Sequence, residues 1–168
     1  MQWRRWISRS VLLVGFVAYG AASWVPTYSP ELTVVMLNIG QGDAMYIRTP
    51  EGIDMLIDGG PDRSVLFELG RVMPPLDHHI EYVIATHPDA DHINGLVELP
   101  SMYTVGTLVM NGDLRDTTAA QALRAWQEQG ISVVDVGRGD VLSADVPFTV
   151  LHPDRTATYE DTNARSLV

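Results

Sequence analysis

Two histidines and two aspartates lie within the six residues His87-Pro88-Asp89-Ala90-Asp91-His92. Their nitrogen and oxygen ligands suit Zn²⁺, Mn²⁺ or Fe²⁺ better than Ca²⁺. In an extended loop His87 and Asp89 point to the same side, and Asp91 and His92 begin the next helix and turn back toward them. We therefore predict that the four side chains hold one or two metal ions. The alternative is a polar helix cap, with Asp89 or Asp91 as the N-cap residue and the histidines in solvent.

The flanking residues predict the elements that position this segment. The apolar run 80–85 before it indicates a strand, and Ile93, Leu96 and Val97 after it share one side of a short helix. Upstream, the glycine-rich residues 38–42 lack the Gly-Lys-Ser/Thr ending of a phosphate-binding loop. Their glycines are expected to permit a tight turn and close approach to the metal loop. Asp58 ends an expected strand at 53–57, where its carboxylate can accept hydrogen bonds from that loop; the alternative is an exposed turn residue.

Three segments together resemble one family of hydrolases. The metal segment is similar to the His-x-His-x-Asp-His motif of metallo-β-lactamase-fold hydrolases. Within that superfamily, the metal segment followed by Gly95-Leu96 resembles the C-terminal domains of ComEC-type competence proteins. The segments 37–44 and 56–60 are similar to the D-V-G-Q-G-D-A and L-I-D-G-G segments of the same domains. This sequence departs from the family at Asp89, which replaces the second histidine, and at Asn38 and Asn94.

The resemblance implies a fold and an activity. The expected fold is an α/β, metallo-β-lactamase-like αββα sandwich, with the metals at the edge between its two sheets. The expected activity is that of a metal-dependent hydrolase, a phosphodiesterase or nuclease acting on DNA outside the cytoplasm, with Zn²⁺ or Mn²⁺ as cofactor. A hydrolase of a small acyl or phosphoryl substrate and an inactive binding remnant are the alternatives.

The resemblance also implies roles for individual residues. His87 and Asp89 would hold a first metal, and Asp91 and His92 a second. Asp91 would also accept a proton from the metal water, and Asp58 would orient the ligands. Residues 163–168 resemble the family's N-N-x-S-L-V segment, with Thr162 in place of the first Asn, so Asn163 and Ser166 are expected near the metal edge.

Composition limits the possible partners. The absence of cysteine excludes disulfides and thiolate ligands. All 11 basic residues are arginine, and three of them precede Glu31, which leaves 8 against 21 acidic residues from there onward, a formal charge of −13. Any contact with DNA must therefore be local, because the overall field of this domain repels a polyanion.

Residues 1–30 are predicted to form a signal peptide or an N-terminal membrane anchor with its linker. Arg4, Arg5 and Arg9 form a positive flank, and the 15-residue run 11–25 carries no charge. That run suits a signal peptide with a cleavage site near Gly20-Ala21-Ala22-Ser23, or an uncleaved transmembrane helix through residues 6–25. In either case the arginines stay in the cytoplasm, and residues 31–168 are exported, either anchored in the membrane or secreted.

The remaining pattern predicts a mixed sheet with helices on its outer face. Strands are expected at 32–37, 44–48, 53–57, 105–110, 132–136 and 147–152, with helices at 64–72 and from 117 or 118 to 129. His78 and His79 are expected on the surface, and His152 in a structural role. The chain ends at Ser166-Leu167-Val168, entering an apolar strand. We expect it to be a fragment, with the family's remaining ligands beyond Val168.

Overall fold

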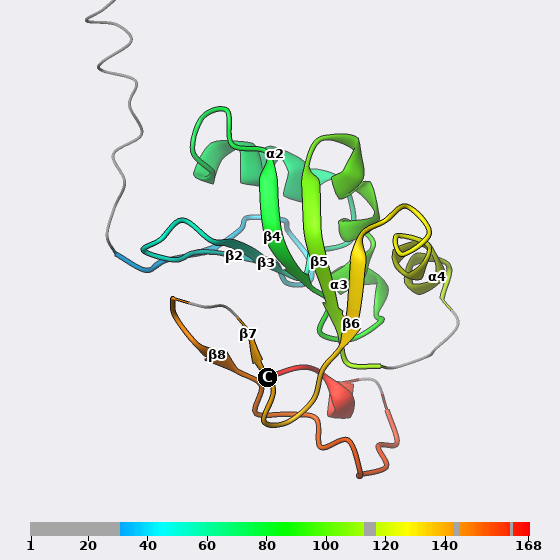
Figure 1. Ribbon diagram of the computed structural model, residues 1–168. Helices are drawn as coiled ribbons and strands as arrows, with labels where there is room; N and C mark the ends of the chain where they lie inside the picture. The colour runs from blue at the N-terminus through cyan, green and yellow to red at the C-terminus, as the bar shows by residue number, and fades with distance from the viewer. Residues whose placement is uncertain (1–30, 113–116, 143–144, 162) are drawn as a thin grey trace, which may run out of the picture.

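The computed structural model describes residues 31–112, 117–142, 145–161 and 163–168. Its centre is a mixed sheet of six strands in the order β1-β2-β3-β4-β5-β6 (Figure 1). The strands from β1 to β3 pair in antiparallel fashion, and those from β3 to β6 pair in parallel. The strands are β1 (Thr33–Met36), β2 (Met45–Arg48), β3 (Asp54–Ile57), β4 (His79–Ile84), β5 (Thr104–Met110) and β6 (Ser132–Asp135).

The connections follow from strand direction. β2 and β3 are antiparallel and need only a tight turn, in which the amide of Gly52 donates to the carbonyl of Thr49 at 2.9 Å. Each parallel pair needs a crossover segment instead. These crossovers are α2 (Ser64–Val72), then α3 (Ala90–Ile93) with the 3₁₀ helix η1 (Leu96–Ser101), and finally α4 (Thr118–Arg124).

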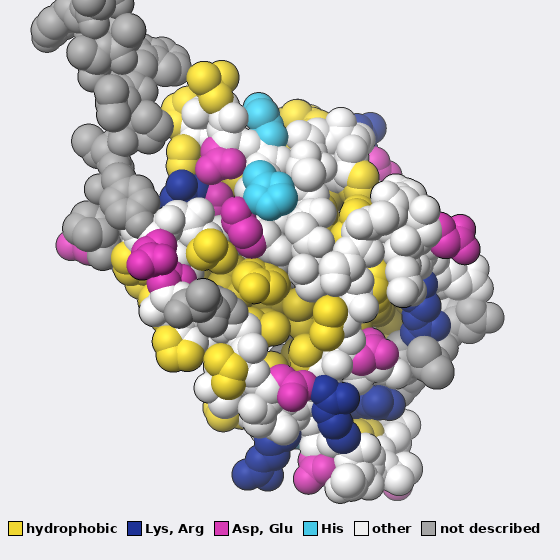
Figure 2. All heavy atoms as spheres, viewed as in Figure 1, with side chains coloured by type: hydrophobic (Ala, Val, Ile, Leu, Met, Phe, Trp, Pro, Cys, Tyr) yellow, Lys and Arg dark blue, Asp and Glu magenta, His cyan; other side chains and the backbone are white. Residues whose placement is uncertain are grey.

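The two faces of the sheet carry separate apolar clusters, because successive residues of a strand point to opposite faces. The larger cluster lies under the helices and includes Leu56 of β3 and Leu69 of α2. The smaller one lies on the other face and includes Met55. A two-stranded hairpin, β7 (Val141–Leu142) and β8 (Phe148–Thr149), covers part of this face and leaves an apolar cavity of about 170 Å³. Figure 2 shows hydrophobic side chains gathered between this hairpin and the sheet.

Most expected elements are present within one residue at each end, and two of them are several residues shorter than expected. The helix predicted at 64–72 is confirmed, with Val65, Leu66 and Leu69 buried. The helix expected to reach residue 129 ends at Arg124, because the next amides donate to carbonyls three residues back, as from Trp126 to Leu123. This tighter winding continues to Gly130 and leaves Trp126 in the core.

The strand predicted at 147–152 was too long. Only Phe148–Thr149 is a strand, although Val150 still donates to the carbonyl of Asp140 and accepts from the amide of Gly139 on the other arm of the hairpin. The amide of Leu151 donates to the carbonyl of Val168 at 2.6 Å. The end of the chain is therefore a second backbone partner of this stretch.

The predicted signal peptide or anchor at 1–30 lies outside the described residues, as does Thr162. No helix within the described part of the chain has the length and apolar character needed to span a bilayer.

A buried carboxylate lies at the start of β3. Asp54 accepts hydrogen bonds from the hydroxyl of Tyr46 at 2.6 Å and from the guanidinium of Arg48 at 2.5 Å. Burial raises the pKa of Asp54 to about 6, although both donors act to lower it. The folded protein therefore holds this proton more tightly than the unfolded chain, whose aspartates have a pKa of about 3.9.

This shift predicts a pH dependence of stability. Between about pH 4 and pH 6 the folded state binds more protons at this site, so the contribution of Asp54 to stability falls as pH rises through that window. In urea titrations we expect the stability difference between the wild type and Asp54→Asn to shift against the wild type from pH 4 to pH 6.5. A difference that stays constant with pH would contradict the raised pKa.

Candidate metal centre

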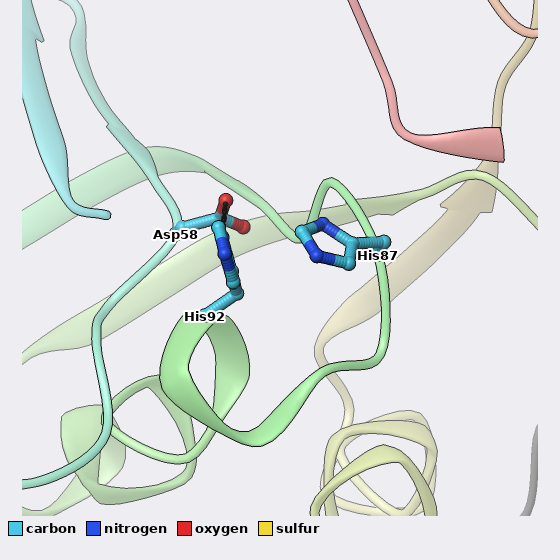
Figure 3. A group of neighbouring side chains, drawn as sticks. All are labelled: Asp58, His87 and His92. Atoms are coloured by element: carbon cyan, nitrogen blue, oxygen red, sulfur yellow. Dashed lines mark hydrogen bonds and ion pairs between the residues drawn. The ribbon is translucent and has the colours of Figure 1, made fainter. Parts of the chain in front are cut away.

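The candidate site lies at the edge where neighbouring parallel strands end. Asp58 directly follows β3, and His87 comes soon after β4. These strands pair in parallel, so their carboxyl ends meet at one edge of the sheet. His92 lies on the short helix α3, which turns back toward β3 and brings the His92 side chain to the same edge (Figure 3). The strand-loop-helix structure predicted for the metal segment is thereby confirmed.

Asp58, His87 and His92 form a group that could hold a metal ion. Their ligand atoms lie within 4.8 Å of one another. The centroids of the two imidazole rings are 4.0 Å apart, with 52° between the ring planes. Figure 3 shows the three side chains converging from separate segments of the backbone.

Asp58 makes contacts with both the loop and a histidine. Its Oδ1 accepts the backbone amide of Thr86 at 2.9 Å. Its Oδ2 accepts the Thr86 hydroxyl at 2.6 Å and lies 2.9 Å from Nδ1 of His92. An ionised carboxylate can only accept, so Nδ1 of His92 carries the proton and Nε2 presents its lone pair. A carboxylate behind a histidine in this way orients the ring and raises its basicity toward a metal.

The electrostatic surroundings of His92 also favour a positive charge at this site. Its hydrogen bond to Asp58 is the main cause that raises its pKa, although partial burial opposes this. The nearby negative charges of Asp58, Asp91 and Asp43 add to the rise. The site therefore attracts positive charge, whether a proton or a metal cation.

His87 presents a nitrogen that needs a ligand. Its side chain is 5% exposed, and Nε2 has no hydrogen-bond partner among the described residues. Oδ2 of Asp89 is 3.7 Å from this nitrogen, which is too far for a hydrogen bond. A buried, unsatisfied polar atom is costly unless something binds it. A metal ion would satisfy this nitrogen, and so the residues present fit one.

The two aspartates of the motif lie beside this group but are not part of it. Asp89 occupies the N-cap position of α3, yet its side chain makes no capping hydrogen bond. Asp91 lies one residue before His92 on α3. The structure therefore brings together two of the four predicted ligands, and the full ligand set stays a prediction.

Glycines let three backbone segments meet around α3. A Cβ on Gly42 would lie 1.8 Å from the carbonyl oxygen of Asp91, and one on Gly95 would lie 2.0 Å from the carbonyl oxygen of Gly59. The amide of Gly59 also donates to the carbonyl of His92 at 2.7 Å. The close approach predicted for the glycine-rich loop is thus present.

A cleft of about 490 Å³ opens beside the histidines. Asn163 and Ser166 also line it, and their role beside a metal stays a prediction. Asp43 also lines it; the sequence places it in the segment 37–44, but nothing singled it out there. The lining residues are Met36, Asp43, Met45, Ile57, Asp58, Thr86, His87, His92, Asn163, Ser166 and Leu167.

Asn111 is a second residue that the sequence did not indicate. It is buried after β5, and its side-chain amide donates at 2.9 Å to the carbonyls of both Thr86 and Arg165. It thereby ties the metal loop to the segment that carries Asn163 and Ser166. Its position at the carboxyl end of a parallel strand was the available signal.

The remaining histidines lie elsewhere. His78 and His79 are exposed, as predicted. His152 lies within hydrogen-bond distance of the carbonyl of Ala164, 2.9 Å from its Nε2. This contact supports the structural role expected for His152.

Comparison with known proteins gives two matches. Residues 37–163 match the model of the metallo-beta-lactamase superfamily, with which the mixed α/β architecture is consistent. The chain is also similar to ComE operon protein 3 of Bacillus subtilis (strain 168), at 33% identity over 148 residues. That alignment covers 77% of this chain and 19% of the relative, so the chain spans about a fifth of the relative's length.

Proposed function

Because the chain belongs to the metallo-beta-lactamase superfamily, we propose that it is a metal-dependent hydrolase that cleaves phosphodiester bonds of DNA outside the cytoplasm. The observation that carries the hydrolase proposal is the buried, unpaired Nε2 of His87 beside His92. The choice of DNA is supported by the likeness to a ComE operon protein, together with the resemblance of three motifs to ComEC-type domains.

The proposed ligands are the four residues of the motif. His87 and Asp89 would hold one ion, and Asp91 and His92 a second; Asp58 would hold His92 in place. Zn²⁺ or Mn²⁺ bound there would activate water near neutral pH and polarise the scissile phosphoryl group. The carboxylate of Asp91 would accept the proton that the attacking water releases. The carboxylate of Asp89 is harder than the imidazole it replaces, which favours tolerance of Mn²⁺.

The cleft offers polar groups for a phosphate. Asn163 and Ser166 line it together with the histidines, and an amide and a hydroxyl can donate to phosphate oxygens. Arg165, between them in sequence, donates to the carbonyl of Asn111 at 3.2 Å and so places a positive charge near this edge. These local contacts would hold a phosphodiester against an acidic background.

The charge of −13 from Glu31 onward favours a second candidate function. A small acyl or phosphoryl substrate would meet less repulsion than a long polyanion. An inactive remnant that retains metal is the third possibility. Nuclease, lactamase and thioesterase assays on the same preparation distinguish the first two, and metal retention without turnover would indicate the third.

The proposal extends to architecture and location. The proposed fold is an αββα sandwich, in which a second sheet covers the face opposite the helices. Met36 and Val134 are 60% and 42% exposed, and hairpin β7–β8 would be the start of that second layer. Residues 1–30 would export the domain as a cleaved signal peptide or hold it at the membrane as an anchor.

A paired mutation tests the proposal. Prepared together with any residues that its gene encodes after Val168, the wild type should bind one or two Mn²⁺ or Zn²⁺ ions per chain and cleave a fluorescent single-stranded DNA. His87→Ala combined with Asp89→Ala should lose at least one ion and all cleavage. Exposed His79→Ala should retain both properties, because its ring lies on the surface at the start of β4. Unchanged metal content in the double variant would refute the ligand assignment. A wild type that binds metal but does not cleave DNA would refute the nuclease function.

A further inference from the structure

The side chain of Thr86 has no role in the proposals above, although it lies between Asp58 and His87. Its backbone is fixed independently of its hydroxyl. The amide donates to Oδ1 of Asp58, and the carbonyl accepts from the amide of Leu167 at 3.0 Å and from the side chain of Asn111. The hydroxyl is therefore held in one place and can serve a separate purpose.

We propose that the Thr86 hydroxyl sets the tautomer of His87. Because the hydroxyl donates its proton to the Asp58 carboxylate, its oxygen can only accept a hydrogen bond from the His87 ring. This inference rests on the proposed metal site. It assigns to Thr86 the role of a positioning residue, which acts on the metal only through His87.

Counting protons gives the direction of each hydrogen bond. The Thr86 hydroxyl has one proton, and its oxygen lies 2.6 Å from Oδ2 of Asp58 and 2.9 Å from Nδ1 of His87. The carboxylate can only accept, so the hydroxyl proton points to Asp58. The hydroxyl oxygen then accepts, and Nδ1 of His87 must be the donor. The proton of neutral His87 is thus on Nδ1, and Nε2 carries a lone pair.

The opposite arrangement is disfavoured by the same distances. If the hydroxyl donated to His87, two oxygen acceptors would face each other at 2.6 Å with no proton between them. The buried Nε2 would also carry a hydrogen with no acceptor among the described residues. The proposed tautomer leaves only a lone pair there, and a metal ion satisfies a lone pair.

One carboxylate oxygen thereby determines the state of both histidines. Oδ2 of Asp58 accepts directly from Nδ1 of His92 at 2.9 Å, and it controls His87 through Thr86. In both rings Nδ1 carries the proton and Nε2 is left to bind metal. Figure 3 shows the carboxylate beside His92, with the ring of His87 across from it.

The test compares Thr86→Val, which has the same shape but no hydroxyl, with Thr86→Ser, which keeps the hydroxyl. Nitrogen-15 NMR of the metal-free proteins in mildly alkaline buffer reports which ring nitrogen is protonated, and five histidines make assignment practical. The wild type and Thr86→Ser should show the Nδ1-protonated form of His87. Thr86→Val should show both tautomers. Its affinity for Mn²⁺ or Zn²⁺ should fall about 10- to 100-fold, the usual effect of losing a group that orients a ligand.

The outcomes separate this inference from the proposed function. A single Nδ1-protonated form and unchanged metal affinity in Thr86→Val would overturn it. If Thr86→Val shows both tautomers but the wild type cleaves no substrate, the inference about Thr86 is supported. Only the proposed hydrolase function is then contradicted. Should Thr86→Val not fold, Thr86→Ala against Thr86→Ser gives the same comparison. A Ser variant that behaves like the Ala variant would refute a role for the hydroxyl.

Discussion

Replacing Asp58 with asparagine should weaken metal binding about 100-fold or more, because two histidines lose the acceptor that orients them. The asparagine side chain would offer one acceptor oxygen where the carboxylate offers two. Its amide nitrogen, if placed at the position of Oδ2, would face Nδ1 of His92 and the hydroxyl of Thr86, which are both donors in the native site. Isothermal titration with Mn²⁺ and Zn²⁺ measures the loss.

A charge-matched control excludes a general electrostatic effect. Glu128→Ala removes one negative charge from an exposed position after α4, and it should leave metal affinity unchanged. Circular dichroism should show that the asparagine variant keeps its secondary structure. Metal affinity within a few fold of the wild type would mean that Asp58 does not support the ligands.

Replacing Gly42 with alanine should destabilise the protein much more than replacing Gly40. Both glycines have a positive φ, +82° and +83°, so each alanine costs about 1 to 2 kcal/mol for its left-handed backbone. A Cβ on Gly40 meets nothing within 4 Å, whereas one on Gly42 would lie 1.8 Å from the carbonyl oxygen of Asp91. Backbone atoms cannot rotate away, so either the loop or α3 must move, at a further cost of about 1 to 3 kcal/mol.

Urea unfolding of the two variants measures this difference directly. Gly42→Ala should also lower metal affinity, because Asp91 and His92 lie on α3, which is one side of this clash. Gly40→Ala should bind metal as the wild type does. Equal loss of stability in both variants would show that the contact with Asp91 is not tight.

The elements that position the site could be predicted because each produces a recognisable pattern in a short stretch of sequence. Helix 64–72 has buried residues at helical spacing, and hairpin β2–β3 has a glycine turn between apolar runs. The early end of α4 could not be predicted in this way. It depends on the place of Trp126 in the core, which is a tertiary contact.

The site itself was predictable only in part, for a related reason. His87 and His92 follow from the motif, since ligand density in six residues is a local signal. Thr86 and Asn111 act through partners 28 and 54 residues away, in Asp58 and Arg165. A lone threonine or asparagine carries no sign of such a partner in the sequence.

The order of the strands has a consequence for how the site is assembled. Every strand of the sheet pairs with its nearest neighbour in sequence, so the sheet can grow along the chain with short loop closures at each step. Residues 163–167, which form one wall of the cleft, are held to the sheet by contacts of long sequence separation with Asn111 and Thr86. The scaffold with its histidines can therefore form before the wall that completes the cleft. That wall can also open locally without global unfolding of the sheet, because fewer contacts tie it to the rest of the fold.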